Sequence, residues 1–256
     1  MGTRGRRLPR LRGLPAQDRS EDPDRPGRAE ELSGDRPVVV VTGASDGIGA
    51  AAIRRLHRSG ARVVVVGRSP EKTAAVAAEL GGVRSATVDL ARLDDVRRLA
   101  AELAELPRID ALVHNAGASF ARRELTVDGH ERTAQVDHLG PYLLTRLLEQ
   151  QLRASRARVV TTSSFMHWVG GARRGHLLDS AGPHLATRAY ARAKWCNVLF
   201  TRELARRWAP QVTATCFDPG AVASSRSPTW TAPSARDDVR AGELWELSAR
   251  LVGLPA

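Results

Sequence analysis

The sequence predicts an α/β fold in which one parallel sheet of about six strands carries helices on both faces. Two observations support this prediction. From Pro37 onward, short runs of β-branched residues alternate with longer stretches whose apolar residues recur at helical spacing. The strand-like runs are continuously apolar, as is typical of strands that are buried on both faces. Alternation of this kind favours a doubly wound sheet.

The elements are expected in a fixed order. The strands, each a short run rich in Val, Ala or Thr, are Val38–Val41, Val63–Val66, Ala86–Val88, Ala111–Val113, Val159–Thr162 and Val212–Phe217. The helices, each with apolar residues on one face, are Ile48–Ser59, Pro70–Leu80, Leu93–Leu103, a long one near Glu131–Ala154, Thr187–Trp208 and a last one over Asp237–Leu251. The stretch 170–183, rich in Gly, Arg and His, is expected to be a loop.

Composition excludes several classes of protein. A hydrophobic content of 42% and a charged content of 26% are ordinary for a soluble domain, and 256 residues are enough for one substantial core. The longest apolar runs are too short to span a bilayer, so we expect no membrane partner. The two cysteines, Cys196 and Cys216, match no metal or disulfide-framework spacing, so we expect no metal site and a cytoplasmic location.

The formal net charge of +11 raises the alternative of a nucleic-acid binder. Most arginines, however, are interleaved with Asp and Glu along the helical stretches, as on solvated helix faces, so no nucleic-acid partner is expected. Residues 1–36 are rich in Arg and Pro and nearly free of large apolar residues. We expect them to form a disordered extension, for which contact with an acidic partner stays open.

One predicted helix combines two residue types that are scarce elsewhere. Only two of the 39 basic residues are lysines, and one of them, Lys194, lies four positions after Tyr190, one of two tyrosines. Side chains at this spacing share a helix face. A lysine carries a compact charge, whereas the arginine side chain is a planar fork. Because an ammonium favours the ionised form of a neighbouring phenol, the pair is a candidate for acid–base chemistry.

A glycine-rich loop follows the first predicted strand and leads into a helix. Glycine allows a tight turn and close approach to a pyrophosphate, and the helix N-terminus offers N–H donors. The loop is therefore a candidate dinucleotide-binding site. The candidate cofactor contacts in it are Gly43, Ser45, Asp46, Gly47, Ile48 and Gly49.

The ends of the second and third strands bear on which dinucleotide binds. Arg68 ends the second strand, where an arginine favours a ribose 2′-phosphate and a carboxylate would bond the 2′-hydroxyl. NADP(H) is therefore favoured over NAD(H), although the carboxylate of Asp46 opposes this preference. Two roles stay open for Asp89 at the end of the third strand, a bond to the adenine amine or a cap on the next helix.

These features resemble the short-chain dehydrogenase/reductase family, and five motifs occur in the family's order. Besides the glycine loop and the Tyr190–Lys194 pair, they are Asn115-Ala116-Gly117, Ser163-Ser164 and Pro219-Gly220, after the fourth, fifth and sixth strands. The stretches His138-Leu139-Gly140, Leu143-Leu144-Thr145 and 197–204 resemble the retinol-dehydrogenase-like branch. The resemblance implies a Rossmann-type NAD(P)-binding domain over residues 37–256.

The resemblance also implies an oxidoreductase that transfers a hydride between a nicotinamide and a small carbonyl or alcohol substrate. Tyr190 would pass the proton, Lys194 would bind the nicotinamide ribose and act on Tyr190, and Ser164, rather than Ser163, would bond the substrate oxygen. A homo-oligomer stays open. The further cofactor contacts implied are Leu90, Asn115, Ala116, Gly117, Tyr190, Lys194, Pro219, Gly220 and Val222.

Two departures from the family qualify this expectation. Asp137 stands where the family usually carries an Asn that helps to hold a water beside the lysine. A carboxylate near Lys194 would pair with its ammonium and weaken the effect on Tyr190, so we expect slowed catalysis. Few residues follow Pro219-Gly220, so a C-terminal strand is expected to be missing, and the substrate's identity is not predicted. The alternative is a catalytically impaired dinucleotide-binding relative.

Overall fold

The computed structural model describes residues 36–171, 178, 185–219 and 237–255. The predicted extension, apart from Arg36, and most of the predicted loop at 170–183 lie outside the described residues. The predictions for these two segments therefore stay predictions.

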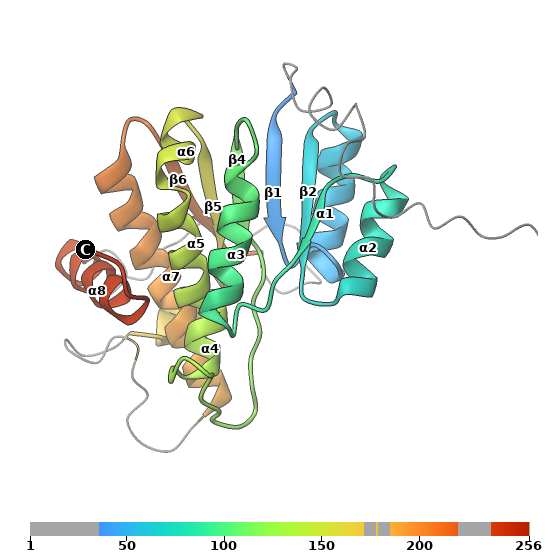
Figure 1. The fold of residues 1–256 in the computed structure, drawn as a ribbon. Coiled ribbons are helices and arrows are strands. Elements are labelled where there is room, and N and C mark those ends of the chain that lie inside the picture. The colour runs from blue at the N-terminus through green and yellow to red at the C-terminus, as the bar shows by residue number, and fades with distance from the viewer. Residues whose placement is uncertain (1–35, 172–177, 179–184, 220–236, 256) are drawn as a thin grey trace, which may run out of the picture. The chain divides into compact units, whose positions relative to one another are not determined.

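The sheet has six parallel strands in the order β3-β2-β1-β4-β5-β6 (Figure 1). This confirms the predicted fold class. The strand order reverses between β1 and β4, and ligands of such sheets bind at the carboxyl ends of strands beside this point. The strands are β1 (Val38–Thr42), β2 (Arg62–Gly67), β3 (Ser85–Thr87), β4 (Ala111–His114), β5 (Arg158–Thr162) and β6 (Thr213–Phe217).

The valines of the central strands form the core because helices cover both faces of the sheet. Val40 of β1 is paired in register with Val64 of β2 and Leu112 of β4. Val39 and Val41 belong to a buried cluster on one face, with Ile53 and Val76 from two covering helices. Successive strand side chains point to opposite faces, so the continuous apolar run serves both faces.

Helices and turns link the strands. The α-helices are α1 (Gly47–Arg58), α2 (Pro70–Glu79), α3 (Leu93–Ala104), α4 (Arg132–Ala134), α5 (Gly140–Leu147), α6 (Glu149–Ala154), α7 (Ala186–Trp208) and α8 (Asp238–Leu251). A π-helical turn, η2 (Gln135–Leu139), and a 3₁₀ turn, η3 (Phe165–Val169), complete the set. Right-handed crossovers place α1 and α2 on one face and α3, α5 and α7 on the other (Figure 1).

The helix predicted near Glu131–Ala154 is present, but it is not one regular α-helix, because the π-helical turn η2 interrupts it and Leu148 separates α5 from α6. Pro141 follows Asp137 by four residues and has no N–H to donate to the Asp137 carbonyl. Asn197 Nδ2, on α7, donates to that carbonyl instead, at 3.0 Å. The turn thus places Asp137 on an irregular segment, a common feature of functional sites.

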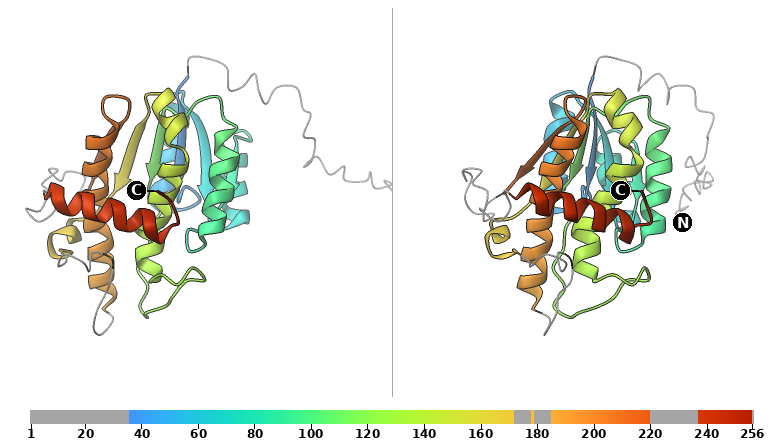
Figure 2. Two further views of the ribbon diagram at one scale, coloured as in Figure 1. Left: turned by 60° about the vertical axis from the view of Figure 1, so that its left-hand side comes forward. Right: turned by 90° about the vertical axis from the view of Figure 1, so that its left-hand side faces the viewer.

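Helix α8 lies across α7 (Figure 2). Its Trp245 is almost fully buried and makes ring contacts with Tyr142, Phe200 and Trp208. The Tyr142 hydroxyl donates to the Trp245 carbonyl at 3.0 Å. The end of the chain is therefore joined to α5 and α7. Among the described residues, no helix is long and apolar enough to cross a membrane.

Replacing Trp245 by Ala should remove the centre of this aromatic cluster. We expect the free energy of unfolding to fall by about 3–5 kcal/mol, the usual cost of a large-to-small change in a packed core. Urea denaturation followed by circular dichroism measures this. Val239→Ala, on the same helix at a position 56% exposed, is the matched control and should change the free energy by less than about 1 kcal/mol. Equal effects of the two changes would contradict the packing role of Trp245.

Candidate active site

The glycine-rich loop joins β1 to α1 in a conformation that requires glycine. Gly43 and Gly47 have φ values of +66° and +52°, in the left-handed region. A Cβ at Gly43 would lie 2.8 Å from the Ala116 Cα, and one at Gly49 would lie 2.1 Å from the Gly43 oxygen. A Cβ at Gly47 would meet nothing within 4 Å. The loop is thus packed tightly against the end of β4, while Gly47 faces open space.

A cavity of about 460 Å³ opens at the carboxyl ends of the central strands. All twelve predicted cofactor contacts from Gly43 to Gly117 line it: Gly43, Ser45, Asp46, Gly47, Ile48, Gly49, Arg68, Asp89, Leu90, Asn115, Ala116 and Gly117. Tyr190, Lys194 and Pro219 are not in its lining, and Gly220 and Val222 lie outside the described residues. The open space at Gly47 and the glycine-rich wall fit a dinucleotide pyrophosphate.

The cavity has six further lining residues that the sequence interpretation missed. Thr42 and Gly67 end β1 and β2, and Val88 directly follows β3, so their positions could have been found from the predicted strand boundaries. Ala118, Arg132 and Val136 come from the segment after β4 and from the interrupted helix. No local pattern marks these three, because tertiary packing brings them to the cavity.

Hydrogen bonds from Asn115 link the glycine loop to the end of β4. Its Nδ2 donates to the carbonyls of Thr42 and Gly43 at 3.1 and 3.2 Å. The backbone N–H groups of Asn115 and Ala116 both donate to Thr42 Oγ1 at 3.2 Å. This residue therefore orders the wall of the cavity.

Charged side chains gather where β2 ends. Arg68 lines the cavity and is exposed. Asp46 caps α1 by accepting from the Gly47 N–H at 2.7 Å, and its other oxygen lies 2.6 Å from Lys72 Nζ. The hydrogen bond from Lys72, and then that from the Gly47 N–H, lower the pKa of the Asp46 carboxyl. Asp46 therefore carries its charge at neutral pH.

Asp89 is not a helix cap, which was one of the two roles left open. The N-cap position of α3 is Arg92, and the Leu93 N–H donates to the side chain of Asp128 at 3.0 Å. Asp89 instead accepts from the Ala91 N–H at 3.0 Å and lines the cavity. Contact with an adenine ring stays a prediction.

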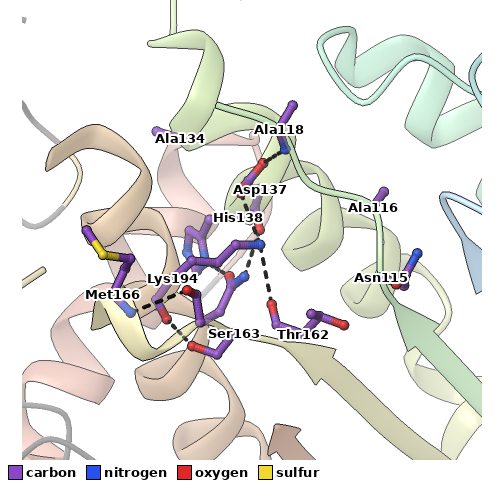
Figure 3. A network of polar contacts seen from close by, with 12 residues as sticks. Asn115, Ala116, Ala118, Ala134, Asp137, His138, Thr162, Ser163, Met166 and Lys194 are labelled. Atoms are coloured by element: carbon purple, nitrogen blue, oxygen red, sulfur yellow. Dashed lines mark hydrogen bonds and ion pairs between the residues drawn. The ribbon is translucent and has the colours of Figure 1, made fainter. Parts of the chain in front are cut away.

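A buried ion pair joins Asp137 and Lys194 (Figure 3). Asp137 Oδ2 lies 3.1 Å from Lys194 Nζ, and both side chains are at most 3% exposed. Asp137 Oδ1 accepts from the Ala118 N–H at 2.7 Å. Burial raises the pKa of the Asp137 carboxyl, and the Lys194 charge opposes that rise. The pairing expected from the sequence is therefore present.

The Lys194 ammonium connects the cavity wall to Tyr190. It lies 5.2 Å from the centre of the Tyr190 ring and donates to the Thr162 carbonyl at 3.4 Å. A Cβ at Gly117, which lines the cavity, would lie 2.8 Å from Nζ. Glycine at this position therefore gives the ammonium room beside the cavity.

The two serines after β5 differ in their bonding. Ser163 is buried, and its hydroxyl donates to the Lys194 carbonyl at 2.9 Å. Ser164 is half-buried and caps η3, where its hydroxyl oxygen accepts from the Met166 N–H at 3.3 Å. An accepting oxygen leaves its proton available to donate to a ligand. This difference favours Ser164 over Ser163 as the residue that bonds a substrate oxygen.

The π-helical turn is held in place by a buried polar chain that runs to α8. His138 Nδ1 lies 3.2 Å from Asn197 Oδ1, and His138 Nε2 lies 2.9 Å from Ser248 Oγ. Burial lowers the pKa of His138 to about 4, so the ring is neutral at neutral pH. The sequence interpretation noted His138 and Asn197 separately, and only the packing of α7 and α8 shows that they meet.

Comparison with known proteins agrees with this geometry. Residues 37–234 match the family model described as short chain dehydrogenase. Retinol dehydrogenase 12 of Mus musculus is 39% identical over 196 residues, covering 73% of this chain and 62% of that protein. The chain spans roughly three fifths of the length of the first curated relatives that it matches.

Solved structures give the same result. A crystal structure of a protein from Mycobacterium paratuberculosis is 31% identical with a TM-score of 0.75, covering 86% of this chain and 97% of that one. A short-chain dehydrogenase from Sphingobium yanoikuyae, solved in complex with NADPH, is 25% identical with a TM-score of 0.60, covering 72% and 71%. The chain therefore belongs to the short-chain dehydrogenase/reductase family, in its retinol-dehydrogenase-like branch, whose members are oxidoreductases acting on CH–OH and C=O groups.

Proposed function

We propose that this protein is an NADP(H)-dependent oxidoreductase that interconverts a small-molecule carbonyl and its alcohol, with Tyr190 as the acid and base. One observation carries the proposal. Tyr190 and Lys194 share a face of α7, and the Lys194 ammonium lies directly behind Gly117 in the wall of a glycine-lined cavity. A phenol and an ammonium beside a glycine-lined cavity together fit hydride-transfer chemistry.

Each residue has a distinct role in this proposal. When bound, NADP(H) supplies or accepts the hydride, and the Gly43–Gly49 loop holds its pyrophosphate. Tyr190 gives its proton to the carbonyl oxygen during reduction and takes the alcohol proton during oxidation. The Ser164 hydroxyl donates to the same oxygen, which stabilises the negative charge that develops there. The positive charge of Lys194 favours the Tyr190 phenolate, which is the form left after reduction and the base that takes the alcohol proton in oxidation.

The preference for NADP(H) rests on the residue at the end of β2. Arg68 lines the cavity directly after β2, at the position where a carboxylate would bond a ribose 2′-hydroxyl, and this arginine outweighs the nearby Asp46 carboxylate, which is paired with Lys72. A guanidinium can form bidentate hydrogen bonds to phosphate oxygens, and these bonds add to the attraction between the opposite charges. The NADPH-bound structure of the Sphingobium relative shows that a protein with this fold takes NADPH.

A second candidate function follows from the Asp137–Lys194 pair. An ammonium whose charge is neutralised by a buried carboxylate at 3.1 Å acts more weakly on Tyr190. The alternative is therefore a dinucleotide-binding protein with impaired catalysis. Both candidate functions include dinucleotide binding, so the affinity for the cofactor does not distinguish them. The rate of turnover does.

The first test is a titration with NADPH and NADH, followed by assays on a panel of carbonyls and alcohols with the parent protein and Tyr190→Phe. We expect tighter binding of NADPH than of NADH, and turnover that falls by about a hundredfold or more in Tyr190→Phe, because the proton donor is lost. NADPH affinity should be kept in the variant. Binding without turnover in the parent would favour the impaired relative, and equal turnover in Tyr190→Phe would rule out its role.

Replacing Asp137 by Asn should restore the full effect of the Lys194 charge on Tyr190. We expect faster turnover, or a pH–rate profile moved to lower pH by roughly one unit, because the phenolate is favoured once the competing carboxylate is gone. Steady-state rates over a range of pH values measure both. A profile identical to that of the parent would show that Asp137 does not tune the pair.

The same substitution should change how stability depends on pH. Because burial raises the pKa of Asp137, the folded protein binds more protons than the unfolded chain between the ordinary and the raised pKa. The parent therefore loses stability as pH rises through this window, and Asp137→Asn does not. We expect the free energy of unfolding of the variant, minus that of the parent, to increase from about pH 4 upward. Urea denaturation at several pH values tests this, and a constant difference would contradict it.

A further inference from the structure

A chain of buried hydrogen bonds runs from α8 to the π-helical turn η2. Ser248 Oγ lies 2.9 Å from His138 Nε2, and His138 Nδ1 lies 3.2 Å from Asn197 Oδ1. Asn197 Nδ2 then donates to the Asp137 carbonyl at 3.0 Å. All four residues are at most 2% exposed. Because little water reaches these groups, the loss of one bond leaves a buried polar atom without a partner.

The direction of donation along this chain is fixed. A carbonyl oxygen only accepts, so Asn197 turns its amide nitrogen to Asp137 and its amide oxygen to His138. That oxygen also only accepts, so the ring proton of His138 is on Nδ1. Burial lowers the pKa of His138 to about 4, so at neutral pH the ring carries one proton and Nε2 has none. The Ser248 hydroxyl is therefore the donor to Nε2.

The chain of bonds ends on the residue that pairs with Lys194. Asp137 Oδ2 lies 3.1 Å from Lys194 Nζ, and Asp137 and His138 are neighbours on η2 (Figure 3). Lys194 and Asn197 lie three positions apart on α7. Helix α7 therefore supplies the ammonium and, through Asn197, also holds the backbone of the residue that carries the opposing carboxylate.

We propose that Ser248 is a positioning residue for the active site: its hydroxyl fixes the ring of His138, and through Asn197 this determines how closely the Asp137 carboxylate approaches Lys194. The inference rests on the proposed action of Lys194 on Tyr190. It gives α8 a role in the chemistry, although no residue of this helix is in the lining of the cavity.

The first test observes the Lys194 ammonium directly by NMR. The chain has only two lysines, and their side chains are 61% exposed in Lys72 and 3% exposed in Lys194, so protein made with isotope-labelled lysine gives two distinguishable sets of signals. Ser248→Ala should shift the Lys194 side-chain signals and leave those of Lys72 unchanged. Ser248→Cys should shift them less, because a thiol is a weak donor.

The second test is the pH–rate profile. Ser248→Ala should move it to lower pH by part of the shift expected for Asp137→Asn, because a carboxylate that is held less closely opposes Lys194 less. Combined with Asp137→Asn, it should cause no further shift, since no carboxylate is left to move. The charged groups that act on the Asp137 carboxyl are Lys194 and Glu131, and neither is changed. KM for NADPH should stay as in the parent, because α8 does not line the cavity.

Thr145→Val is the matched control, because it removes a hydroxyl from another buried histidine. Thr145 Oγ1 lies 2.7 Å from His114 Nε2, and both residues are at most 2% exposed. The Thr145 hydroxyl also contacts the Pro141 carbonyl, at 2.8 Å, and not Asp137. Thr145→Val and Ser248→Ala should both lower the urea midpoint of unfolding. Only Ser248→Ala should change the Lys194 signals and the pH–rate profile.

Three outcomes would overturn the inference. The first is Lys194 signals that match those of the parent in Ser248→Ala or, if that variant does not fold, in Ser248→Cys. The second is an equally large change of the Lys194 signals in Thr145→Val. The third is a pH–rate shift from Ser248→Ala that is the same with and without Asp137→Asn. A parent without turnover would overturn the proposed function, whereas the lysine signals would still test the inference, so the two failures are distinguishable.

Discussion

The buried Asp137–Lys194 ion pair is the interaction on which the site depends. Removing two charges from water is unfavourable unless the surroundings supply hydrogen bonds and a close geometry. The structure supplies both, through the Ala118 N–H on the carboxylate and the Thr162 carbonyl on the ammonium. The absence of a side chain at Gly117 gives the ammonium its space. Four segments, namely the stretch after β4, η2, the end of β5 and α7, must therefore meet accurately around two charges.

The helix after β4 is irregular at Asp137, one partner of this ion pair. A continuous helix through Asp137 would have no donor for its carbonyl, because Pro141 lacks an N–H. The chain forms a π-helical turn instead, and Asn197 of α7 donates to the carbonyl from outside. His138 extends the contact to Ser248, so α8 supports the turn although it lies far along the chain. The same helices that build the core thus hold the charged pair.

A second aspartate–lysine ion pair lies beside the cavity, near the end of β2. Asp46 and Lys72 form an ion pair beside the loop, but this one is exposed to solvent, whereas the Asp137–Lys194 pair is buried. The difference matters because solvent weakens an exposed pair and allows its partners to change. A buried pair keeps its partners, because no solvent competes for either charge. Each lysine thus forms an ion pair with an aspartate, but the Lys72 pair is exposed to solvent and can change its partners, whereas the Lys194 pair is buried and cannot.

The sequence by itself determined the order of strands and helices along the chain and the place of the glycine loop after the first strand, because these depend on local periodicity and short motifs. It also singled out Ser164, Tyr190 and Lys194 as candidates by short motifs alone. Each strand boundary was predicted to within one residue for the same reason. Only the tertiary structure decided that Arg132 and Val136 line the cavity, that η2 interrupts a helix, and that His138 meets Ser248. These features arise from contacts between residues far apart in sequence, and no local pattern encodes which distant group will satisfy a buried polar atom.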